Sequence, residues 1–311
     1  MSEMLVVDNI IKHYGNFLAL DQFSCTMPQG VIGLLGPNGA GKTTFIRSLL
    51  GIHPFESGEI RFHEYSLPKD SLIVKDMIGY QPEVATQLHK ITAMKYVTHM
   101  CRLAGLPHEA AIQRAFDTLH YVGLEEARYR NMMEFSQGML QKVKLATALV
   151  HDPELLLLDE PTAGCDPASR EQILSLIFDL GKNFGKNIII STHLLPDIEN
   201  HADYVVVVNN GKTVMEGTLE QVMRQKDTDV KLQVQVSGDN NQFASILEKH
   251  GFRILSIDGI INCTPPKDMI ASGNYNEVFK LAKQAETDVR MVTPFRLSLE
   301  DVFLDVVEEE K

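Results

Sequence analysis

The sequence predicts an α/β domain that carries a helical insert and is followed by a small α+β domain. Three observations predict this: a glycine-rich turn between an apolar strand and a helix, a second apolar strand that ends in two carboxylates, and helical periodicity between them. The chain turns polar near Arg224–Asp229, and short strands and helices alternate beyond it. We therefore expect one domain at residues 1–225, with the helical insert at about 86–149, and a second domain at 226–311.

The α/β domain is expected to begin with strands and a helix joined by a glycine-rich loop. Leu5–Ile10 and Val31–Leu35 are apolar and rich in β-formers, which predicts strands. Lys42–Leu50 follows the loop and predicts a helix that ends near Gly51.

The expected helical insert shows apolar residues at helical spacing. Thr92 is a suitable N-cap. The apolar positions after it are Met94, Val97, Met100, Cys101 and Ala104. Gly105–Pro107 should end this helix, and His108–Val122 and Ser136–Val150 predict two more.

The second half of the α/β domain alternates strands with a helix. Leu155–Leu158 is a continuous apolar run, as in a buried parallel strand. Ser169–Leu180 predicts a helix and Asn187–Ser191 a strand. The next two predicted strands are Tyr204–Val208 and Lys212–Glu216, separated by Asn209-Asn210-Gly211. The Asn-Gly pair predicts that they form a hairpin.

The second domain is expected to alternate strand, helix, strand, strand, helix, strand and helix, which is typical of a small α+β unit. Its predicted strands are Val230–Val236, Phe252–Ile257, Ile260–Cys263 and Val289–Val292.

Composition limits the function classes. Of the 311 residues, 44% are hydrophobic and 23% are charged, which predicts a packed protein and excludes extensive disorder. The formal net charge of −12 does not favour binding to bulk nucleic acid, whose phosphates need Lys and Arg, so no nucleic-acid partner is expected. A nucleotide can still bind, because backbone amides and one lysine provide local positive potential.

The cysteines and apolar runs indicate the compartment. The four cysteines (Cys25, Cys101, Cys165 and Cys263) form no C-x-x-C pair, so neither a disulfide framework nor a zinc site is suggested. Scattered thiols fit a reducing cytosol. The N-terminus lacks a signal-peptide pattern, and the apolar runs are only strand-sized. We expect a cytoplasmic protein whose membrane role, if it has one, comes through a partner.

A glycine-rich string predicts nucleotide binding. It matches G-x-x-x-x-G-K-[ST] and consists of Gly36, Pro37, Asn38, Gly39, Ala40, Gly41, Lys42, Thr43 and Thr44. The glycines let backbone amides converge on phosphate at a helix N-terminus. Lys42 can reach the β- and γ-phosphates, and the Thr43 hydroxyl can ligate Mg²⁺. ATP and Mg²⁺ are therefore the expected ligands.

Two carboxylates follow the apolar run Leu155–Leu158. A strand that ends in Asp159-Glu160 delivers both to the carboxyl edge of a sheet, where ligand sites of open α/β sheets lie. Asp159 is expected to hold Mg²⁺, through water, and Glu160 to act as general base for the attacking water.

A third string narrows the class of nucleotide-binding protein to which the chain can belong. Phe135-Ser136-Gln137-Gly138-Met139, followed by Gln141-Lys142, resembles the L-S-G-G-Q signature of ATP-binding cassette (ABC) ATPases. Ser136 and Gly138 match the signature, whereas Phe135, Gln137 and Met139 depart from its commonest form. The Ser-x-Gly-Met variant is similar to that of the drug-, antibiotic- and sodium-export branch.

Four more landmarks of that family occur in order. Tyr14 is similar to the aromatic residue that stacks on adenine, and Gln81 to the Q-loop residue that touches Mg²⁺ and the attacking water. Asp166 resembles the D-loop aspartate, with Cys165 where leucine is usual. His193 resembles the switch histidine that bonds the γ-phosphate. The resemblance covers roughly residues 4 to 220.

The resemblance implies a P-loop NTPase of the ABC ATPase type, with an antiparallel β subdomain and a helical insert. It also implies that two cassettes, either two copies or close relatives, pair head to tail, with ATP between one P-loop and the other chain's Ser136–Gly138. The implied partner is an integral membrane permease subunit, docked on the helical insert at the cytoplasmic face. The branch implies export.

Two alternatives remain open at this point. Another P-loop enzyme, such as a kinase or GTPase, is the first, although no guanine-reading N-K-x-D string is present. A non-transport ABC ATPase could act on ribosomes or DNA, although the single P-loop, the absence of a heptad run and the acidic charge argue against it. The string Ser298–Leu304 resembles the C-terminal segment of the export branch, and we interpret it as a capped helix rather than a metal site.

Overall fold

The computed structural model divides the chain into two units, Met1–Leu219 and Glu220–Lys311. The residues that the structure describes are 3–84, 90–199, 201–226, 231–257, 259–266, 269, 275–285 and 287–295. The division falls after Leu219, the first residue of helix α7 (Leu219–Lys226), whereas composition suggested a boundary at 225/226, at the end of the same helix.

A six-stranded sheet runs through the N-terminal unit in the order β10-β9-β3-β8-β7-β6. Its strands are β3 (Val31–Leu35), β6 (Ile78–Gln81), β7 (Leu155–Asp159), β8 (Asn187–Thr192), β9 (Tyr204–Asn209) and β10 (Lys212–Gly217). All neighbouring pairs are parallel except β9 and β10, which form the hairpin that Asn210-Gly211 predicts. Strands β3, β7 and β8 are buried along their whole length, which confirms the prediction for continuous apolar runs.

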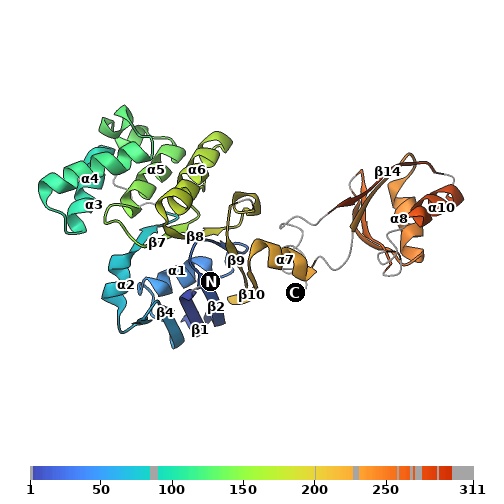
Figure 1. The fold of residues 1–311 in the computed structure, drawn as a ribbon, viewed down its shortest axis with the longest axis horizontal. Helices are drawn as coiled ribbons and strands as arrows, with labels where there is room; N and C mark the ends of the chain where they lie inside the picture. The colour runs from blue at the N-terminus through green and yellow to red at the C-terminus, as the bar shows by residue number, and fades with distance from the viewer. Residues whose placement is uncertain are drawn as a thin grey trace. The chain divides into compact units, whose positions relative to one another are not determined.

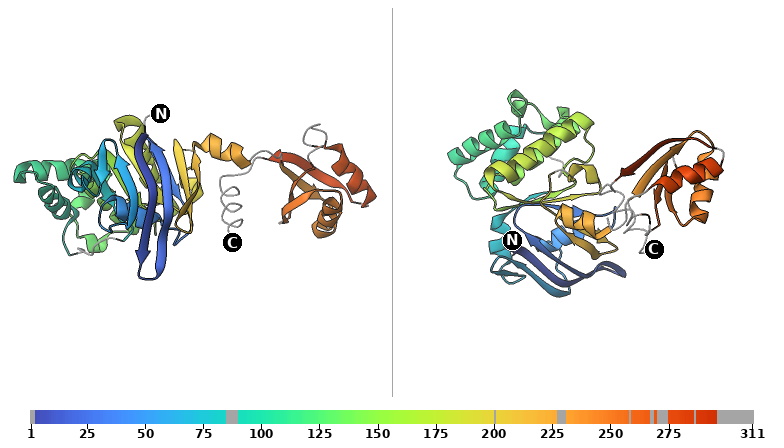
Figure 2. Two further views of the ribbon diagram at one scale, coloured as in Figure 1. Left: turned by 90° about the horizontal axis from the view of Figure 1, so that it is seen from below. Right: turned by 45° about the vertical axis from the view of Figure 1, so that its right-hand side comes forward.

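A second, antiparallel sheet has the order β2-β1-β4-β5 and is visible as the blue strands in Figure 2. Its strands are β1 (Glu3–Tyr14), β2 (Phe17–Pro28), β4 (Ser57–Phe62) and β5 (Tyr65–Leu67), and α2 (Ser71–Met77) follows. Helix α1 (Lys42–Leu49) contacts strands of both sheets, and its buried Phe45 lies 4.8 Å from Phe23 of β2, ring centroid to ring centroid. One apolar core therefore fixes the helix that follows the glycine-rich loop.

The helical insert lies at one end of the unit, on the opposite side of β7 and β8 from α1 (Figure 1). It contains α3 (Ala93–Leu103), α4 (His108–Tyr121), the 3₁₀ turns η1 (Glu126–Tyr129) and η2 (Met132–Glu134), and α5 (Gln137–Ala148). Thr92 caps α3 as predicted, since its side chain accepts a hydrogen bond from Lys95 N.

Helix α6 (Pro167–Phe184) packs beside α5 and is longer than the predicted Ser169–Leu180. It starts earlier because Asp166 is its N-cap and Pro167 suits the first helical turn. It ends at Gly185, whose φ of 62° ends the helix in the left-handed conformation. The 3₁₀ turn η3 (Leu195–Asp197) follows β8.

The C-terminal unit follows a β-α-β-β-α-β pattern. Its strands are β11 (Lys231–Val236), β12 (Arg253–Ile257), β13 (Ile261–Thr264) and β14 (Val289–Phe295), and its helices are α8 (Asn240–Lys249) and α10 (Asn276–Gln284). The sheet order β12-β13-β11-β14 is that of a split βαβ fold, with α8 and α10 in contact on one face (Figure 1). The predicted order of elements is confirmed up to β14, and Ser298–Leu304 lies outside the described residues.

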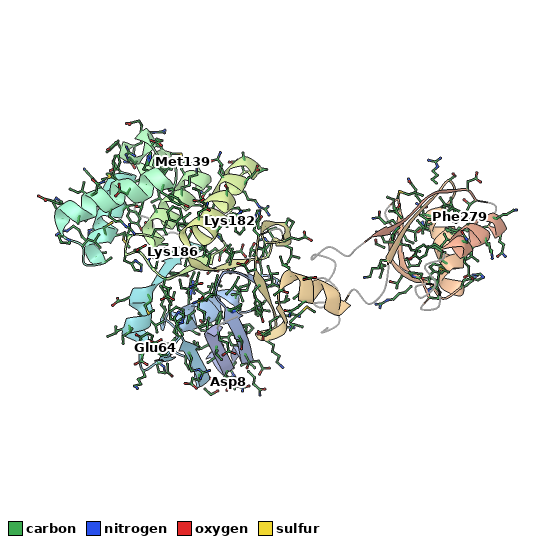
Figure 3. All side chains as sticks on the ribbon, viewed as in Figure 1. Asp8, Glu64, Met139, Lys182, Lys186 and Phe279 are labelled. Atoms are coloured by element: carbon green, nitrogen blue, oxygen red, sulfur yellow. The ribbon has the colours of Figure 1, made fainter. Side chains whose placement is uncertain are left out.

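The C-terminal unit contains an apolar core with a buried thiol. The C-terminal unit has its own core, which includes Leu232, Phe243 and Cys263, whereas Phe279 on α10 is half exposed (Figure 3). Burial raises the pKa of Cys263 to about 12, so this thiol stays protonated. All four cysteines are free.

Across the described parts of the chain, no helix is both long and apolar enough to cross a bilayer.

Candidate nucleotide-binding site

The glycine-rich loop between β3 and α1 needs glycine for steric reasons. A Cβ added at Gly36 would lie 2.4 Å from the Val208 carbonyl oxygen. Gly41, the N-cap of α1, has a φ of 111°, and a Cβ there would lie 2.9 Å from the Ala19 carbonyl oxygen. Larger residues would push the loop away from β2 and β9, so the spacing of the motif reflects the close packing of this loop.

A cavity of about 370 Å³ opens over this loop. It is lined by Phe17, Ala19, Asn38, Gly39, Ala40, Gly41, Lys42, Thr43, Thr44, Glu83 and Glu160. Lys42 is buried, and its Nζ donates to the carbonyl oxygens of Gly36 (2.5 Å) and Pro37 (3.1 Å). Burial lowers the pKa of Lys42, and the nearby carboxylates of Glu160 and Asp159 oppose that shift. The predicted phosphate-binding residues thus surround one hollow with a cation at its base.

Asp159 ends β7 beside Thr43. The Thr43 hydroxyl donates to Asp159 Oδ1 (3.2 Å), and the Ser191 hydroxyl of β8 donates to the same oxygen (2.5 Å). Asp159 Oδ2 and Gln81 Oε1 are both buried and have no hydrogen-bond partner among the described residues. A carboxylate, a hydroxyl and an amide oxygen are hard donors, and two of these oxygens lack a partner. The residues present therefore fit a hydrated Mg²⁺.

Glu160 is held in an unusual backbone conformation. Its φ of 48° lies in the left-handed region, which is costly for a residue with a side chain. The Glu160 amide donates to the Ser191 carbonyl oxygen (3.1 Å), which anchors this turn to β8. The buried carboxylate lies 3.9 Å from Lys42 Nζ and 3.0 Å from His193 Nδ1. The strained turn therefore places Glu160 between Lys42 and His193.

Gln81 has a partner that sequence reasoning did not identify. It is the last residue of β6 and is fully buried, and its Nε2 donates to Gln141 Oε1 of α5 (2.9 Å). In the sequence, Gln141 is recognisable only as part of the signature string. The spacing in sequence gave no signal for this contact.

Phe17 lines the cavity, whereas stacking of Tyr14 on adenine stays a prediction. Tyr14 lies edge-on to His53, with ring centroids 5.4 Å apart, and Lys12 Nζ lies 5.4 Å from the Tyr14 ring. Phe17 faces Tyr14 across the β1–β2 turn and lines the cavity, whereas Tyr14 does not. Phe17 is exposed and available for stacking. The hairpin register decides which aromatic ring faces the loop, and the sequence did not reveal that register.

Ser136 and Gly138 form the start of α5, as predicted. The Ser136 hydroxyl accepts from Met139 N (3.2 Å) and caps the helix. Gly138 is buried against α6, since a Cβ there would lie 2.6 Å from the Ser169 side chain. Figure 3 shows Met139 at the opposite end of the unit from Asp8 of β1. Neither Ser136 nor Gly138 is among the described residues that line the cavity over the glycine-rich loop.

Asp166 caps α6, and Asp197 connects three segments near the site. The sequence analysis did not identify Asp197 as a site residue. Asp166 accepts from the Ser169 amide and hydroxyl, and these hydrogen bonds lower the pKa of its carboxyl. Asp197, in η3, is buried and accepts from Arg170 Nε (2.6 Å) and from the Thr162 hydroxyl (3.1 Å). It therefore ties the segment after His193 to the segments after Glu160 and Asp166.

Comparison with known proteins agrees with this geometry. A family model described as ABC transporter matches residues 20–163. The linearmycin resistance ATP-binding protein LnrL of Bacillus subtilis is 35% identical over 77% of this chain and 77% of its own length. The bacitracin transport ATP-binding protein BcrA of Bacillus licheniformis is 32% identical over 99% of this chain and 98% of its own length.

A solved structure extends the likeness to the fold. CbiO1 of Clostridium perfringens, part of the ABC transporter complex cbiONQ, matches with a TM-score of 0.65 and 27% identity, covering 73% of this chain and 93% of that one. On the strength of that fold and these relatives, the chain belongs to the ABC transporter family of ATP-binding proteins.

Proposed function

We propose that this chain is the ATP-binding and ATP-hydrolysing subunit of an ABC transporter, and that it works as one half of a pair. The observation that carries the proposal is the convergence of Lys42, Thr43, Asp159 and Glu160, with His193 against Glu160, at one edge of the central sheet. These residues come from three separate segments: the start of α1, the end of β7 and the turn after β8.

The loop between β3 and α1 is suited to a triphosphate. Its backbone amides and the N-terminus of α1 provide positive potential for phosphate oxygens. Lys42 Nζ bonds loop carbonyl oxygens and lies close to the cavity wall, so it can exchange those partners for phosphate oxygens without a large movement. An exposed aromatic ring, Phe17, borders the same cavity and offers a face to a purine.

Thr43, Asp159 and Gln81 are the residues that would hold Mg²⁺. When bound with ATP, the ion supplies charge neutralisation on the phosphate oxygens. The hydroxyl of Ser191 fixes the Asp159 carboxylate, and this leaves Oδ2 available.

Glu160 is suited to polarise a water molecule. Its carboxylate is buried, it borders the cavity, and it is held by a strained turn rather than by a flexible loop. A fixed base loses little entropy in the reaction. His193 bonds the carboxylate through Nδ1 and is partly exposed, so its ring can hold Glu160 in position.

The signature helix start would serve a second chain. Ser136 is exposed and begins an α-helix, which is a suitable place for an anion, yet it does not line the cavity of its own chain. In a head-to-tail pair, each γ-phosphate would lie between one P-loop and the other chain's Ser136. ATP would then hold the pair closed, and phosphate release would open it.

Partner, direction and location follow from the relatives. LnrL and BcrA are named for linearmycin resistance and bacitracin transport, which supports export of a compound through a separate membrane permease. This chain would sit at the cytoplasmic face of that permease. No residue of the described chain identifies the exported compound.

Hydrolysis of ATP by the purified chain tests the proposal. We expect release of phosphate that needs Mg²⁺, stops with excess EDTA and returns when Mg²⁺ is restored. Failure to bind ATP with Mg²⁺ would overturn the proposal. The transport part is tested by reconstituting the chain in vesicles with the membrane protein encoded beside it, where the permease should change the hydrolysis rate. Association with ribosomes instead would support the non-transport alternative.

A further inference from the structure

Gln141 of α5 is a buried amide whose two ends are both engaged. Its Nε2 donates to the Ala163 carbonyl oxygen (3.0 Å), and its Oε1 accepts from Gln81 Nε2 (2.9 Å). It is only 3% exposed, so no bulk water competes for these bonds. Gln141 thus joins the end of β6 to the segment that follows Glu160.

These two bonds fix the orientation of the Gln81 amide. A backbone carbonyl can only accept, so Ala163 requires the NH₂ end of Gln141. That choice leaves the oxygen of Gln141 facing Gln81, which must then present its own NH₂ group. The remaining end of Gln81 is Oε1, which is buried and has no hydrogen-bond partner among the described residues.

The free oxygen of Gln81 lies at the edge of the sheet that carries Asp159. Gln81 of β6 pairs in parallel register with Leu158, the residue before Asp159 in β7. Asp159 Oδ2 is the second buried oxygen here that has no hydrogen-bond partner in the described part of the chain. A cation site needs oxygen atoms and tolerates no NH₂ group, so the orientation of Gln81 decides whether it can contribute.

A second side chain of α5 holds the backbone after Gln81. Lys144 lies one helical turn beyond Gln141 and donates from Nζ to the carbonyl oxygens of Pro82 (3.1 Å) and Glu83 (2.6 Å). Helix α5, which Ser136 caps, therefore holds the side chain of Gln81 and the backbone of Pro82 and Glu83 by hydrogen bonds.

We propose that Gln141 is a positioning residue that orients the Gln81 amide with its oxygen toward the Mg²⁺ site, and that this contact ties the site to the signature helix. The proposal rests on the proposed function, because it takes Gln81 and Asp159 as the residues facing the metal. Gln141 itself touches neither ATP nor the ion. A movement of α5, whose N-terminus would meet the second chain's ATP, would change the orientation of Gln81 in its own chain.

The first test replaces Gln141 by methionine, which has similar length and no amide. Without its partner, the Gln81 amide can turn over, and loss of one buried hydrogen bond predicts a weakening of the Mg²⁺ effect by about two- to tenfold. We expect the Mg²⁺ concentration for half-maximal hydrolysis to rise by this factor. In equilibrium binding of a fluorescent ATP analogue, the gain in affinity on adding Mg²⁺ should shrink equally, whereas the affinity in EDTA should not change.

Two further variants separate orientation from a merely structural role. Gln141→Glu keeps an oxygen for Gln81 Nε2 but sets a carboxylate against the Ala163 carbonyl, so it should lower the Tm and yet preserve the Mg²⁺ dependence. Gln81→Glu has two equivalent oxygens, so adding Gln141→Met to it should cause no further shift. Gln172→Met is the matched control, because Gln172 also bonds a side chain between α5 and α6 but lies outside the site.

The outcomes distinguish failure of the positioning role of Gln141 from failure of the proposed function. If Gln141→Met leaves the Mg²⁺ dependence unchanged while Gln81→Ala shifts it, the positioning role is wrong and the proposed function stands. The same holds if Gln141→Glu and Gln141→Met shift it equally, or if Gln141→Met adds its full effect to Gln81→Glu. If the unaltered chain binds the ATP analogue no better with Mg²⁺ than in EDTA, the proposed function itself fails.

Discussion

The glycine-rich loop leads into the N-terminus of α1, and the signature string leads into the N-terminus of α5. The surroundings of these two helix N-termini differ. At the N-terminus of α1 the chain supplies a cavity, a buried lysine and two carboxylates. At the N-terminus of α5 it supplies a capping serine, exposed to solvent, and a glycine pressed against α6. The first region resembles most of an active site, whereas the second resembles a contact surface.

This difference indicates that two chains contribute different parts to each ATP site. The loop cavity is lined by Lys42, Thr43 and Glu160, to which we assign ATP binding and hydrolysis, so one chain should bind ATP alone. The signature start has an anion-binding helix end but no cavity of its own among the described residues. Its contribution should therefore show in pairing and turnover rather than in ATP binding by a single chain.

Replacing Glu160 by glutamine should cause the largest effect. A general base contributes about 10²- to 10⁴-fold, and we expect a loss of kcat in that range with ATP binding retained. Light scattering should then detect an ATP-dependent pair that accumulates because turnover is blocked. Glu64→Gln, in the exposed turn between β4 and β5, is the control (Figure 3). An unchanged hydrolysis rate would remove Glu160 from the role of base.

Replacing Lys42 by alanine should weaken ATP binding itself. A hydrogen bond to a charged group contributes about 1.5–3 kcal/mol, which corresponds to roughly a 10- to 150-fold rise in the Kd for ATP. Isothermal titration calorimetry with the single chain measures it. Lys182→Ala on α6, distant from the cavity, should bind ATP normally, and equal affinity in both variants would contradict the role of Lys42.

Replacing His193 by alanine should slow hydrolysis and leave ATP binding intact. His193 bonds the Glu160 carboxylate and is absent from the cavity lining, so its loss should lower kcat by about tenfold with little change in Kd. Single-turnover hydrolysis separates this effect from product release. Normal turnover in this variant would leave His193 a packing role only.

Replacing Ser136 by alanine should have the smallest effect and is the sharpest test of the comparison. In a Glu160→Gln background, ATP-dependent pairing should weaken by a few-fold, whereas the Kd for ATP of the unpaired chain should not change. Because the change also removes an N-cap, worth about 1 kcal/mol, Thr92→Ala at the N-cap of α3 is the matched control. Weaker ATP binding by the single chain would place Ser136 in its own chain's site.

Local sequence signals predicted most of the elements. The strand before the glycine-rich loop, the N-cap at Thr92, the Asn-Gly hairpin and the element order of the C-terminal unit all agree with the structure. The start of α6 was placed too late, because the capping role of Asp166 was not recognised. Most of the antiparallel sheet was expected only from the family resemblance, although Phe23–Met27 of its edge strand β2 alternates apolar and polar residues.

By itself, the sequence determined the family and predicted the residues that bind phosphate and metal. Those properties depend on short strings whose chemistry is local. Only the tertiary structure decided that Phe17 borders the cavity, that Asp197 ties three segments together and that Gln141 meets Gln81, a residue 60 positions away. Contacts of that kind depend on strand register and helix packing, and side-chain spacing along the chain carries no record of either.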